Sequence, residues 1–332
     1  MKKKIFISGS SGFIGFHLSK SLLSKGIKVH GYDSMNNYYD LKLKKSRLQI
    51  LKKYKNFTFT KNTLENMKIL KRSVLKFKPN FIIHLAAQAG VRYSIDEPRK
   101  FINSNIIGTY NILELSQKLK VKHLIIASSS SVYGSKRFNK SKEIDKTDNQ
   151  LSIYAATKKS SECIAHSYSS LWNIPTTLLR FFTVYGPWGR PDMAYFKFTK
   201  SIIENKKIDV YNKGKMFRDL IYIDDVVKSL EILINKPPKI KKFQNDSLSD
   251  IAPFRIVNIG NQKKIYLKKF INEIEKQLKK KAKKNFLSMQ KGDVRETLSN
   301  SNLLYEITKF KPKINYKLGI SKFISWYKVF YS

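Results

Sequence analysis

Two side chains able to share a proton stand four residues apart, in the run Tyr154-Ala155-Ala156-Thr157-Lys158. Positions four apart lie on one face of a helix, which puts the Lys158 ammonium beside the Tyr154 phenol. A phenol has a pKa of about 10, and a neighbouring positive charge lowers that pKa towards neutrality. Ser129 precedes Tyr154 by 25 residues and carries a hydroxyl that can orient a substrate oxygen. We therefore predict a site that removes a proton from a substrate oxygen, with Ser129, Tyr154 and Lys158 as its catalytic residues.

A glycine-rich segment, Gly9-Ser10-Ser11-Gly12-Phe13-Ile14-Gly15, joins the first predicted strand to the first predicted helix. Glycines let the backbone turn tightly and approach a pyrophosphate, whose charge is then stabilised by the N-terminus of the helix. Asp33 follows Gly15 by 18 residues, at the end of the second predicted strand. A carboxylate at that point accepts hydrogen bonds from ribose hydroxyls and repels a 2′-phosphate. The combination predicts a dinucleotide site formed by Gly9, Gly12, Gly15 and Asp33, and it favours NAD over NADP.

The elements that must position these residues alternate short apolar runs with helix-length amphipathic stretches, which predicts βαβ units and a parallel sheet. In the first half, strands are expected at 5–8, 28–32, 57–60, 81–85, 123–127 and 176–181. In the second half, strands are expected at 208–211 and 217–223, joined by a hairpin turn at Asn212-Lys213-Gly214, and at 255–259. Helices are expected at 226–234, with Asp224 and Asp225 as capping residues, and over 267–284.

The predicted fold class is α/β: a Rossmann-type doubly wound parallel sheet with a smaller α/β C-terminal substrate-binding domain. We expect the NAD-binding Rossmann domain to cover residues 1–182, with return segments near 221–235 and 255–262. The substrate-binding domain is then expected to cover residues 183–220 and 263–332.

The charge balance raises the question of a polyanionic partner. The 332 residues include 65 Lys+Arg against 24 Asp+Glu, so the formal net charge is +41. However, 55 of the 65 cations are Lys, spread along the whole chain. Nucleic-acid-binding proteins rely on Arg for its bidentate fork, so we expect no specific nucleic-acid partner.

Other residue types limit the class of protein further. Cys163 is the single cysteine, which excludes an internal disulfide, and the five histidines form no ligand-spaced pair, so no metal site is expected. No apolar run approaches the roughly 20 residues that a membrane helix needs. Gly9 and Gly12 interrupt the apolar stretch that follows the basic N-terminus, which argues against a signal peptide. We expect a cytoplasmic protein without a membrane partner.

Taken together, the motifs resemble the extended short-chain dehydrogenases/reductases of the NAD-dependent epimerase/dehydratase family, and among them the UDP-glucuronate 4-epimerases. Segments 9–15 and 128–134 are typical of the whole superfamily. The stretch from Arg180 to Ala194, which reads RFFTVYGPWGRPDMA, is much more specific. Further matching stretches are 36–40, 85–94, 154–159, 222–225 and 292–297.

The resemblance implies NAD as cofactor, a UDP-sugar as substrate, and epimerisation of UDP-glucuronate to UDP-galacturonate, which supplies surface polysaccharide synthesis. In the implied reaction Tyr154 takes the proton from the sugar O4 while a hydride passes from C4 to NAD. The 4-keto sugar then rotates, and the hydride returns to its other face. The resemblance gives Ser129 the orienting role and puts Lys158 on the nicotinamide ribose. It also implies a homodimer built on the helices around 103–118 and 154–170.

The remaining site residues follow from the same resemblance. The implied cofactor contacts are Phe13, Ile14, Leu64, Ala86, Ala87, Gln88, Asn105 and Phe182. Arg92 is expected to contact the substrate, and Arg218 and Arg295 its diphosphate end, where a guanidinium is a suitable partner.

Related enzymes of this fold dehydrate or decarboxylate similar sugars. A dehydratase needs an acid–carboxylate pair just after the catalytic hydroxyl, where this chain has Ser130 and Ser131. A 4-keto-uronate loses CO₂ readily, so an epimerase must hold the carboxylate still, and Ser130, Thr183 and Arg190 are the expected clamp. Two alternatives stay open: a UDP-glucuronate decarboxylase or other nucleotide-sugar epimerase or dehydratase, and a nucleic-acid-binding protein that has lost catalysis.

Overall fold

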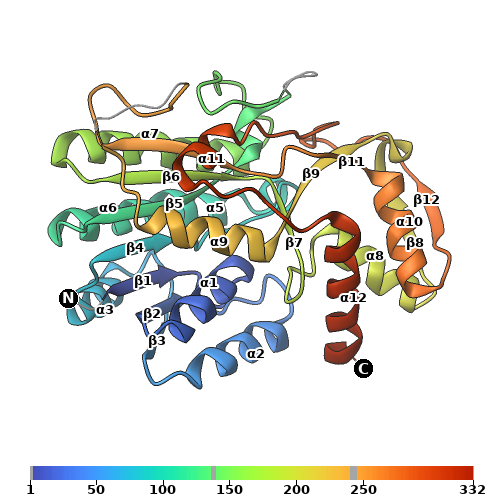
Figure 1. Cartoon of the computed structure of the whole chain (residues 1–332), viewed down its shortest axis with the longest axis horizontal. Helices are drawn as coiled ribbons and strands as arrows, with labels where there is room; N and C mark the ends of the chain where they lie inside the picture. Colours follow the sequence, from blue (N-terminus) through green and yellow to red (C-terminus); the bar gives the residue numbers. More distant parts are fainter. Residues whose placement is uncertain (1–2, 136–139, 240–244, 332) are drawn as a thin grey trace.

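The computed structural model describes residues 3–135, 140–239 and 245–331. At its centre lies a parallel seven-stranded sheet with the strand order β10-β6-β5-β4-β1-β2-β3 (Figure 1). Its strands are β1 (Lys4–Ser8), β2 (Lys28–Asp33), β3 (Phe57–Lys61), β4 (Phe81–His84), β5 (His123–Ser129), β6 (Thr176–Phe181) and β10 (Phe254–Ile259). The inner strands are buried along most of their length, which explains their near-continuous apolar sequence.

Helices cover both faces of this sheet (Figure 1). One layer holds α1 (Phe13–Ser24), α2 (Leu41–Lys52) and α9 (Ile223–Ile234), and the other holds α3 (Met67–Phe77), α6 (Gly108–Lys118) and α7 (Ile153–Trp172). The short helices α4 (Tyr93–Asp96) and α5 (Pro98–Phe101) and the π-helix η1 (Ile102–Ile107) lead into α6. This doubly wound arrangement confirms the predicted fold class. Every helix in the described part of the chain is too short or too polar to cross a bilayer.

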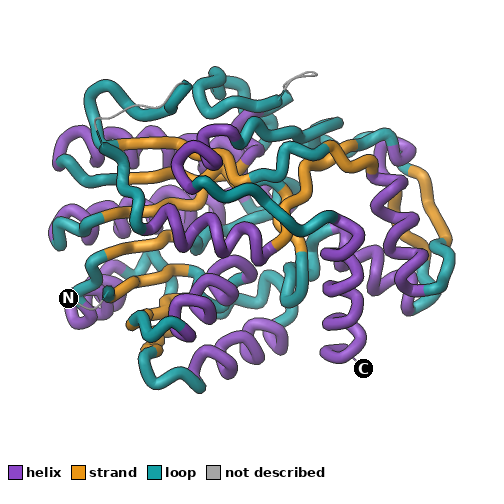
Figure 2. The backbone as a smooth tube through the Cα atoms, in the orientation of Figure 1, coloured by secondary structure: helices purple, strands orange, loops and turns teal. Residues whose placement is uncertain are grey.

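A smaller part of the molecule lies beyond one edge of the central sheet and mixes short strands with helices (Figure 2). Its three-stranded sheet contains β7 (Thr183–Tyr185), β9 (Phe217–Tyr222) and β11 (Lys264–Tyr266), and its two-stranded sheet contains β8 (Lys207–Val210) and β12 (Lys283–Phe286). The accompanying helices are α8 (Ala194–Ile203), α10 (Leu267–Leu278), α11 (Asn302–Thr308) and α12 (Tyr316–Tyr331), with short 3₁₀ turns η2 (Ser130–Tyr133) and η3 (Tyr211–Gly214) elsewhere in the chain.

The hairpin predicted at residues 212–214 is wrong. The strands before and after it belong to different sheets, because β8 pairs with β12 whereas β9 pairs with β7 and β11. Asn212 and Lys213 both take the left-handed conformation, with φ of 50° and 49°. The amide of Lys213 donates to the carbonyl of Leu287, so the turn is bound to the segment after β12 and does not close a two-stranded ladder.

The helix predicted over 267–284 is too long. Helix α10 ends at Leu278, because Lys279 adopts the left-handed conformation with φ of 53°. The lysine-rich segment beyond it forms the exposed strand β12 along β8. The apolar helical spacing was therefore informative only as far as Leu278.

The predicted capping role of Asp224 and Asp225 is also wrong. Helix α9 already begins at Ile223 and has no side-chain cap. Asp225 is buried, and its carboxylate accepts the backbone N–H groups of Lys313 and Ile314, at 3.1 and 3.0 Å. It therefore attaches the C-terminal segment to the start of α9.

The topology decides where a site can form. The chain order reverses between β1 and β4, which are direct neighbours, and open α/β sheets bind ligands at the carboxyl ends of strands near such a reversal. The glycine segment follows β1, Asp33 ends β2, and Ser129 ends β5, so these residues all lie at one edge of the sheet.

Candidate active site

A cavity of about 1340 Å³ opens at this edge and is walled by both parts of the molecule. Most of the predicted site residues line it: Gly9, Gly12, Phe13, Ile14, Gly15, Asp33, Leu64, Ala86, Ala87, Gln88, Arg92, Ser129, Ser130, Tyr154, Lys158, Phe182, Thr183, Arg190 and Arg218. Asn105 and Arg295 are not among its lining residues.

The glycine segment is packed so closely that side chains do not fit. A Cβ atom on Gly15 would lie 2.0 Å from the carbonyl oxygen of Gly9, and one on Gly9 would lie 2.7 Å from the amide nitrogen of Ala86. Helix α1 begins directly after Gly12, with no side-chain cap and no acidic residue in its first turn. The positive end of the helix is therefore open to an anion in the cavity.

Asp33 is fixed at the neighbouring corner of the cavity. Its Oδ2 accepts the amide of Ser11 at 3.0 Å, and its Oδ1 accepts the amide of Met35 at 2.9 Å. Each carboxylate oxygen can accept a further hydrogen bond, which leaves capacity for a ligand hydroxyl. Burial lowers the pKa of the adjacent Lys44 to about 8, while the charge of Asp33 opposes this shift.

Helix α7 carries both residues of the proton-transfer pair. The helix is capped by the Ser152 side chain, which accepts the amide of Ala155 at 3.1 Å. Lys158 is buried, and its Nζ donates to the carbonyl oxygen of Ala127 on β5 at 2.9 Å. Tyr154 is half-buried at the cavity wall. The sequence spacing thus brings the phenol and the ammonium to one cavity, with the ammonium anchored to the end of β5.

Burial acts on both groups and disfavours their charged forms. It raises the pKa of the Tyr154 phenol, whereas a hydrogen bond with Ser129 and the charge of Arg190 lower that pKa. It also lowers the pKa of Lys158 to about 8, against the opposing charge of Glu162. Arg190 thus contributes a positive charge that lowers the pKa of Tyr154, a connection that the sequence did not indicate.

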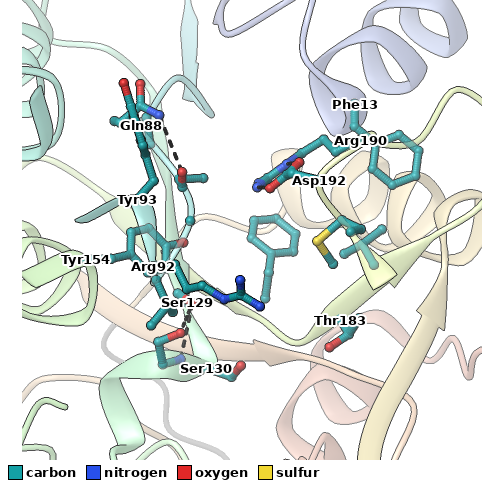
Figure 3. A pocket seen from close by; sticks show the side chains of 18 of the residues that line it. Phe13, Gln88, Arg92, Tyr93, Ser129, Ser130, Tyr154, Thr183, Arg190 and Asp192 are labelled. Carbon is teal, nitrogen blue, oxygen red and sulfur yellow. Dashed lines mark hydrogen bonds and ion pairs between the residues drawn. The ribbon is translucent and has the colours of Figure 1, made fainter. Parts of the chain in front are cut away.

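Ser129 ends β5 and caps the following 3₁₀ turn. Its Oγ accepts the amide of Ser131 at 3.2 Å and donates to the Oγ of Ser131 at 3.1 Å. Figure 3 shows Ser129, Ser130 and Tyr154 on one side of the cavity. The structure thus brings all three predicted catalytic residues and a second serine to the same wall.

Arg190 lies across the cavity from Tyr154 and Ser129, on the same side as Thr183 (Figure 3). Its Nε donates to Oδ1 of Asp192 at 3.0 Å, and its terminal nitrogen donates to Oδ2. The Tyr38 hydroxyl also donates to Asp192, at 3.3 Å. Burial raises the pKa of Asp192, but the charge and hydrogen bonds of Arg190 outweigh it and hold that pKa below its ordinary value.

Two further arginines hold the segment 287–298 against the cavity. Arg92 donates from Nε to Oε1 of Gln290 at 2.6 Å, and its guanidinium lies 4.8 Å from the centre of the Tyr211 ring. Arg218 donates to Oδ1 of Asp293 at 2.9 Å. Arg92, Arg218 and their partners Gln290 and Asp293 all line the cavity.

The two predicted residues outside the cavity lining have different surroundings. Asn105 is buried behind Gln88, accepting its amide at 2.8 Å and donating to its carbonyl at 3.0 Å. Its side chain therefore fixes the backbone of a lining residue. The Arg295 residue is exposed, and its carbonyl accepts the amide of Phe217 at 3.1 Å. A ligand contact of either side chain stays a prediction.

Comparison with known proteins identifies the family. Residues 5–260 match the model of the NAD dependent epimerase/dehydratase family. The chain belongs to this family. The resemblance predicted from the sequence motifs is thereby confirmed.

Similar proteins match the chain over nearly its full length. A Staphylococcus aureus protein named CapI is 49% identical over 332 residues, which is 99% of both chains. A probable UDP-glucuronate 4-epimerase of Rhizobium meliloti is 44% identical over 98% of this chain and 96% of its own. The solved structure of the Bacillus cereus UDP-glucuronic acid 4-epimerase, in complex with UDP-glucuronic acid and NAD, has a TM-score of 0.88 at 30% identity and covers 99% of this chain and 100% of its own.

Sequence reasoning gave no role to the partners of the three cavity arginines. Asp192, Gln290 and Asp293 each accept a hydrogen bond from one of them. The sequence could have indicated Asp192, because it follows Arg190 by two residues in a loop and its carboxylate can therefore reach the Arg190 guanidinium. Gln290 and Asp293 lie far along the chain from their arginines, and spacing alone gives no signal for such pairs.

Arg47 is a second omission, in a helix that otherwise contains lysines. It is fully buried and donates to the carbonyl of Ser11 at 2.9 Å, to the Tyr39 hydroxyl at 2.8 Å and to the carbonyl of Gly189 at 3.1 Å. It therefore connects the glycine segment with the loop that carries Arg190. The sequence signal for Arg47 was its residue type, because an arginine is unusual in a chain whose cations are mostly lysines.

Proposed function

We propose that this chain catalyses NAD-dependent 4-epimerisation of UDP-glucuronate to UDP-galacturonate, which supplies a sugar nucleotide for surface polysaccharide synthesis. The observation that carries the proposal is the content of a single cavity. One wall holds Ser129, Tyr154 and Lys158, the opposite wall holds Arg190 and Thr183, and a glycine-rich helix start lies beside them. Full-length similarity to proteins named UDP-glucuronate 4-epimerase supports the same substrate.

The residues present fit NAD. The tight glycine segment and the uncapped start of α1 suit a pyrophosphate, and Asp33 suits the adenosine ribose. We propose contacts to the cofactor from Gly9, Gly12, Phe13, Ile14, Gly15, Asp33, Leu64, Ala86, Ala87, Gln88, Lys158 and Phe182, with Asn105 acting at least through Gln88. When bound, NAD supplies reversible hydride acceptance at C4 of the sugar.

The chain's own residues move the proton. Tyr154 takes the proton from the sugar O4 and later returns it, while the Ser129 hydroxyl orients that oxygen. Because burial raises the pKa of Tyr154, the phenolate needs nearby positive charge. Arg190 provides part of it, and the Lys158 ammonium keeps the ribose end of the cofactor in place.

Specificity for a uronate is assigned to a clamp of Ser130, Thr183 and Arg190. Loss of CO₂ from the 4-keto sugar requires the C5–C6 bond to align with the carbonyl π system, so a fixed carboxylate protects the intermediate. A guanidinium binds a carboxylate with two parallel hydrogen bonds. Arg190 already makes this kind of contact with Asp192, and its orientation is therefore set before the substrate arrives.

The nucleotide end is assigned to Arg218 and Arg295, and Arg92 is proposed to contact the substrate. Arg218 lines the cavity and donates to Asp293. Arg295 follows Asp293 on the same segment, so its side chain is proposed to contact the diphosphate together with Arg218. Guanidinium groups are suited to phosphate oxygens.

Incubation of the protein with NAD and UDP-glucuronate, followed by identification of the products, tests the proposal. UDP-galacturonate without release of CO₂ is the expected result. A UDP-pentose together with CO₂ identifies a decarboxylase instead, and loss of water identifies a dehydratase.

We propose the division of the chain that the sequence indicated: an NAD-binding part at 1–182, with return segments near 221–235 and 255–262, and a sugar-nucleotide part at 183–220 and 263–332. The split of the sheets between these ranges supports it. A cytoplasmic location is proposed with it.

A homodimer is proposed on helices α6 and α7. Large apolar side chains are exposed on and beside these helices, which is typical of a covered face: Ile102, Ile107, Tyr110, Ile153, Leu171 and Trp172. Light scattering is expected to give twice the chain mass, and a clean monomer at working concentration contradicts the proposal.

A further inference from the structure

A buried ion pair lies directly beneath the catalytic helix. The side chains of Glu162 and Arg180 are only 3% and 2% exposed. Arg180 donates from Nε to Oε1 of Glu162 at 2.9 Å and from a terminal nitrogen to Oε2 at 2.8 Å. The Ser128 hydroxyl donates to the same Oε1 at 2.6 Å. The carboxylate is therefore held by two neighbouring strands.

The position of this carboxylate relates it to the three catalytic residues. Glu162 lies on α7, four residues after Lys158 and eight after Tyr154, so all three share one face of the helix. Its partner Ser128 directly precedes Ser129 on β5, and Lys158 itself donates to the carbonyl of Ala127 on that strand. Glu162 thus joins the helix with the base to the strand with the orienting hydroxyl.

A contribution to folding stability does not by itself explain why this ion pair is buried here. Removing two charges from water costs free energy that their attraction often fails to recover, and apolar residues of similar volume frequently do as well. The pair also sits next to a third buried charge, the Lys158 ammonium, which is only 4% exposed. A buried ammonium needs a nearby negative charge to stay protonated.

We propose that Glu162 is a positioning residue of the active site: it keeps Lys158 protonated and fixes α7 against the end of β5. The inference rests on the proposed epimerase function, because it assigns Lys158 a role in that reaction. Glu162 reaches no lining position of the cavity and acts through Lys158 and Ser128.

The surrounding charges support the electrostatic half of this assignment. Burial lowers the pKa of Lys158 to about 8, and the charge of Glu162 is what opposes that shift. The other titratable groups near Lys158 and the ion pair are His84 on β4, Tyr133 on η2, Glu143 before α7 and Tyr154 on α7. Burial lowers the pKa of His84 to about 3, so the imidazole is uncharged near pH 7, and it raises the pKa of Glu143 to about 7, so that carboxyl is only partly ionised there. Glu162 is the carboxylate whose charge acts on Lys158.

The experiment compares pH profiles of Glu162→Gln and the wild-type holoenzyme. Glutamine keeps the shape and an acceptor for Arg180 but removes the charge. The alkaline limb of the kcat profile is expected to move to lower pH by about one unit. NAD affinity, followed by protein fluorescence without turnover, is expected to weaken more between pH 7 and 8 in the variant than in the wild type, where the pKa of Lys158 is about 8.

Asp246→Asn is the matched control. Asp246 forms a second buried bidentate pair with Arg255 of the edge strand β10, through contacts of 2.9 Å and 2.9 Å. Its loss is expected to lower stability without moving the alkaline limb. Glu162→Asp, which keeps the charge with a shorter side chain, is expected to retain the wild-type limb and lose kcat.

The proposal is overturned if the alkaline limb of the kcat profile of Glu162→Gln lies at the same pH as that of the wild type. It is also overturned if Asp246→Asn moves this limb as far as Glu162→Gln does. If Glu162→Gln does not fold, the double variant Glu162→Gln/Arg180→Met removes the unpaired guanidinium, and its limb must move in the same direction. A wild-type protein that forms no UDP-galacturonate overturns the proposed function instead, so the two failures are distinguishable. The pH dependence of NAD binding still tests Glu162 in that case.

Discussion

At the scale of single residues, the Tyr154 hydroxyl is the group that accepts the proton. Its removal should abolish this proton transfer and leave the rest of the site in place. Tyr154→Phe is expected to keep the fold and NAD binding, because the phenol makes no structural hydrogen bond to the backbone and its ring still packs 6.1 Å from that of Phe101. Turnover is expected to fall by about 10²–10⁴-fold, the usual range for a general base. Steady-state kinetics with UDP-glucuronate, together with a measurement of bound NAD, checks this. Near-normal turnover removes Tyr154 from the mechanism.

Arg190 is the residue expected to separate a uronate from a neutral sugar. Hydrogen bonds to charged groups contribute about 1.5–3 kcal/mol net, so Arg190→Ala should lower binding and turnover of UDP-glucuronate at least about tenfold. UDP-glucose has no carboxylate, so its binding should change little, although its turnover also loses the effect of the Arg190 charge on Tyr154. The freed 4-keto intermediate should also release CO₂ and leave a UDP-pentose.

Kinetics on both substrates with mass analysis of the products tests this prediction. Arg99→Ala, at an exposed position outside the cavity lining, serves as control. If binding of both sugars weakens alike and no pentose forms, Arg190 only supports its loop or contacts phosphate.

The sequence was sufficient to predict which side chains do the chemistry but not how their charges are balanced. Tyr154 and Lys158 follow from helical spacing, and Asp33 follows from its distance to the glycine segment, because both relations are local. The pairings of Arg190 with Asp192 and of Arg218 with Asp293 depend on how loops fold back over the cavity. The same holds for the effect of Arg190 on the Tyr154 pKa, which only the folded chain produces.

At the scale of elements, the segment before α7 is attached to strand β10 by a buried carboxylate. Oε1 of Glu143 accepts the amide of Asn258 at 2.9 Å, and burial raises the pKa of Glu143 from about 4.5 to about 7. A group whose pKa is higher in the folded state contributes stability below its unfolded pKa, and that contribution is lost as the pH rises through the folded value. The free energy of unfolding should therefore decrease between pH 4.5 and pH 7 on account of this residue.

Glu143→Gln is expected to abolish this decrease in the free energy of unfolding with rising pH, because glutamine has no proton to lose. Its amide oxygen still accepts the hydrogen bond from Asn258. At pH 8 the variant should be more stable than the wild type by up to about 3 kcal/mol, whereas near pH 4 the two should agree. Denaturant unfolding at both pH values measures the difference. Glu306→Gln, at an exposed helix position paired with Lys309, is the control. A gain of equal size at both pH values contradicts the assignment.

Elements were predictable where one local rule decided them. The strands of the central sheet and helix α1 follow from alternating apolar runs and a glycine boundary, since burial on both faces leaves a strong pattern. The prediction of a hairpin at 212–214 failed because strand pairing depends on the tertiary fold, and β8 pairs with β12. The end of α10 failed because a left-handed lysine at position 279 has no signature in the sequence.

At the scale of the whole molecule, the cavity exists only because two parts of the chain face each other. Its walls draw on residues from Gly9 to Leu298, and the buried Arg47 links the glycine segment to the loop of Arg190. The high net charge does not define the cavity. A few arginines line it, whereas most of the positive charge belongs to lysines spread along the chain. The central claim is that one cavity oxidises and reduces the same sugar carbon without net change in NAD.

The most direct test follows a label through that cycle. UDP-glucuronate carrying deuterium at C4 is converted by the NAD-loaded enzyme in ordinary water, and the product is examined by NMR and mass spectrometry. The account predicts UDP-galacturonate that retains deuterium at an inverted C4, with no label in the solvent. Loss of the deuterium to water, or its recovery in a decarboxylated pentose, contradicts it.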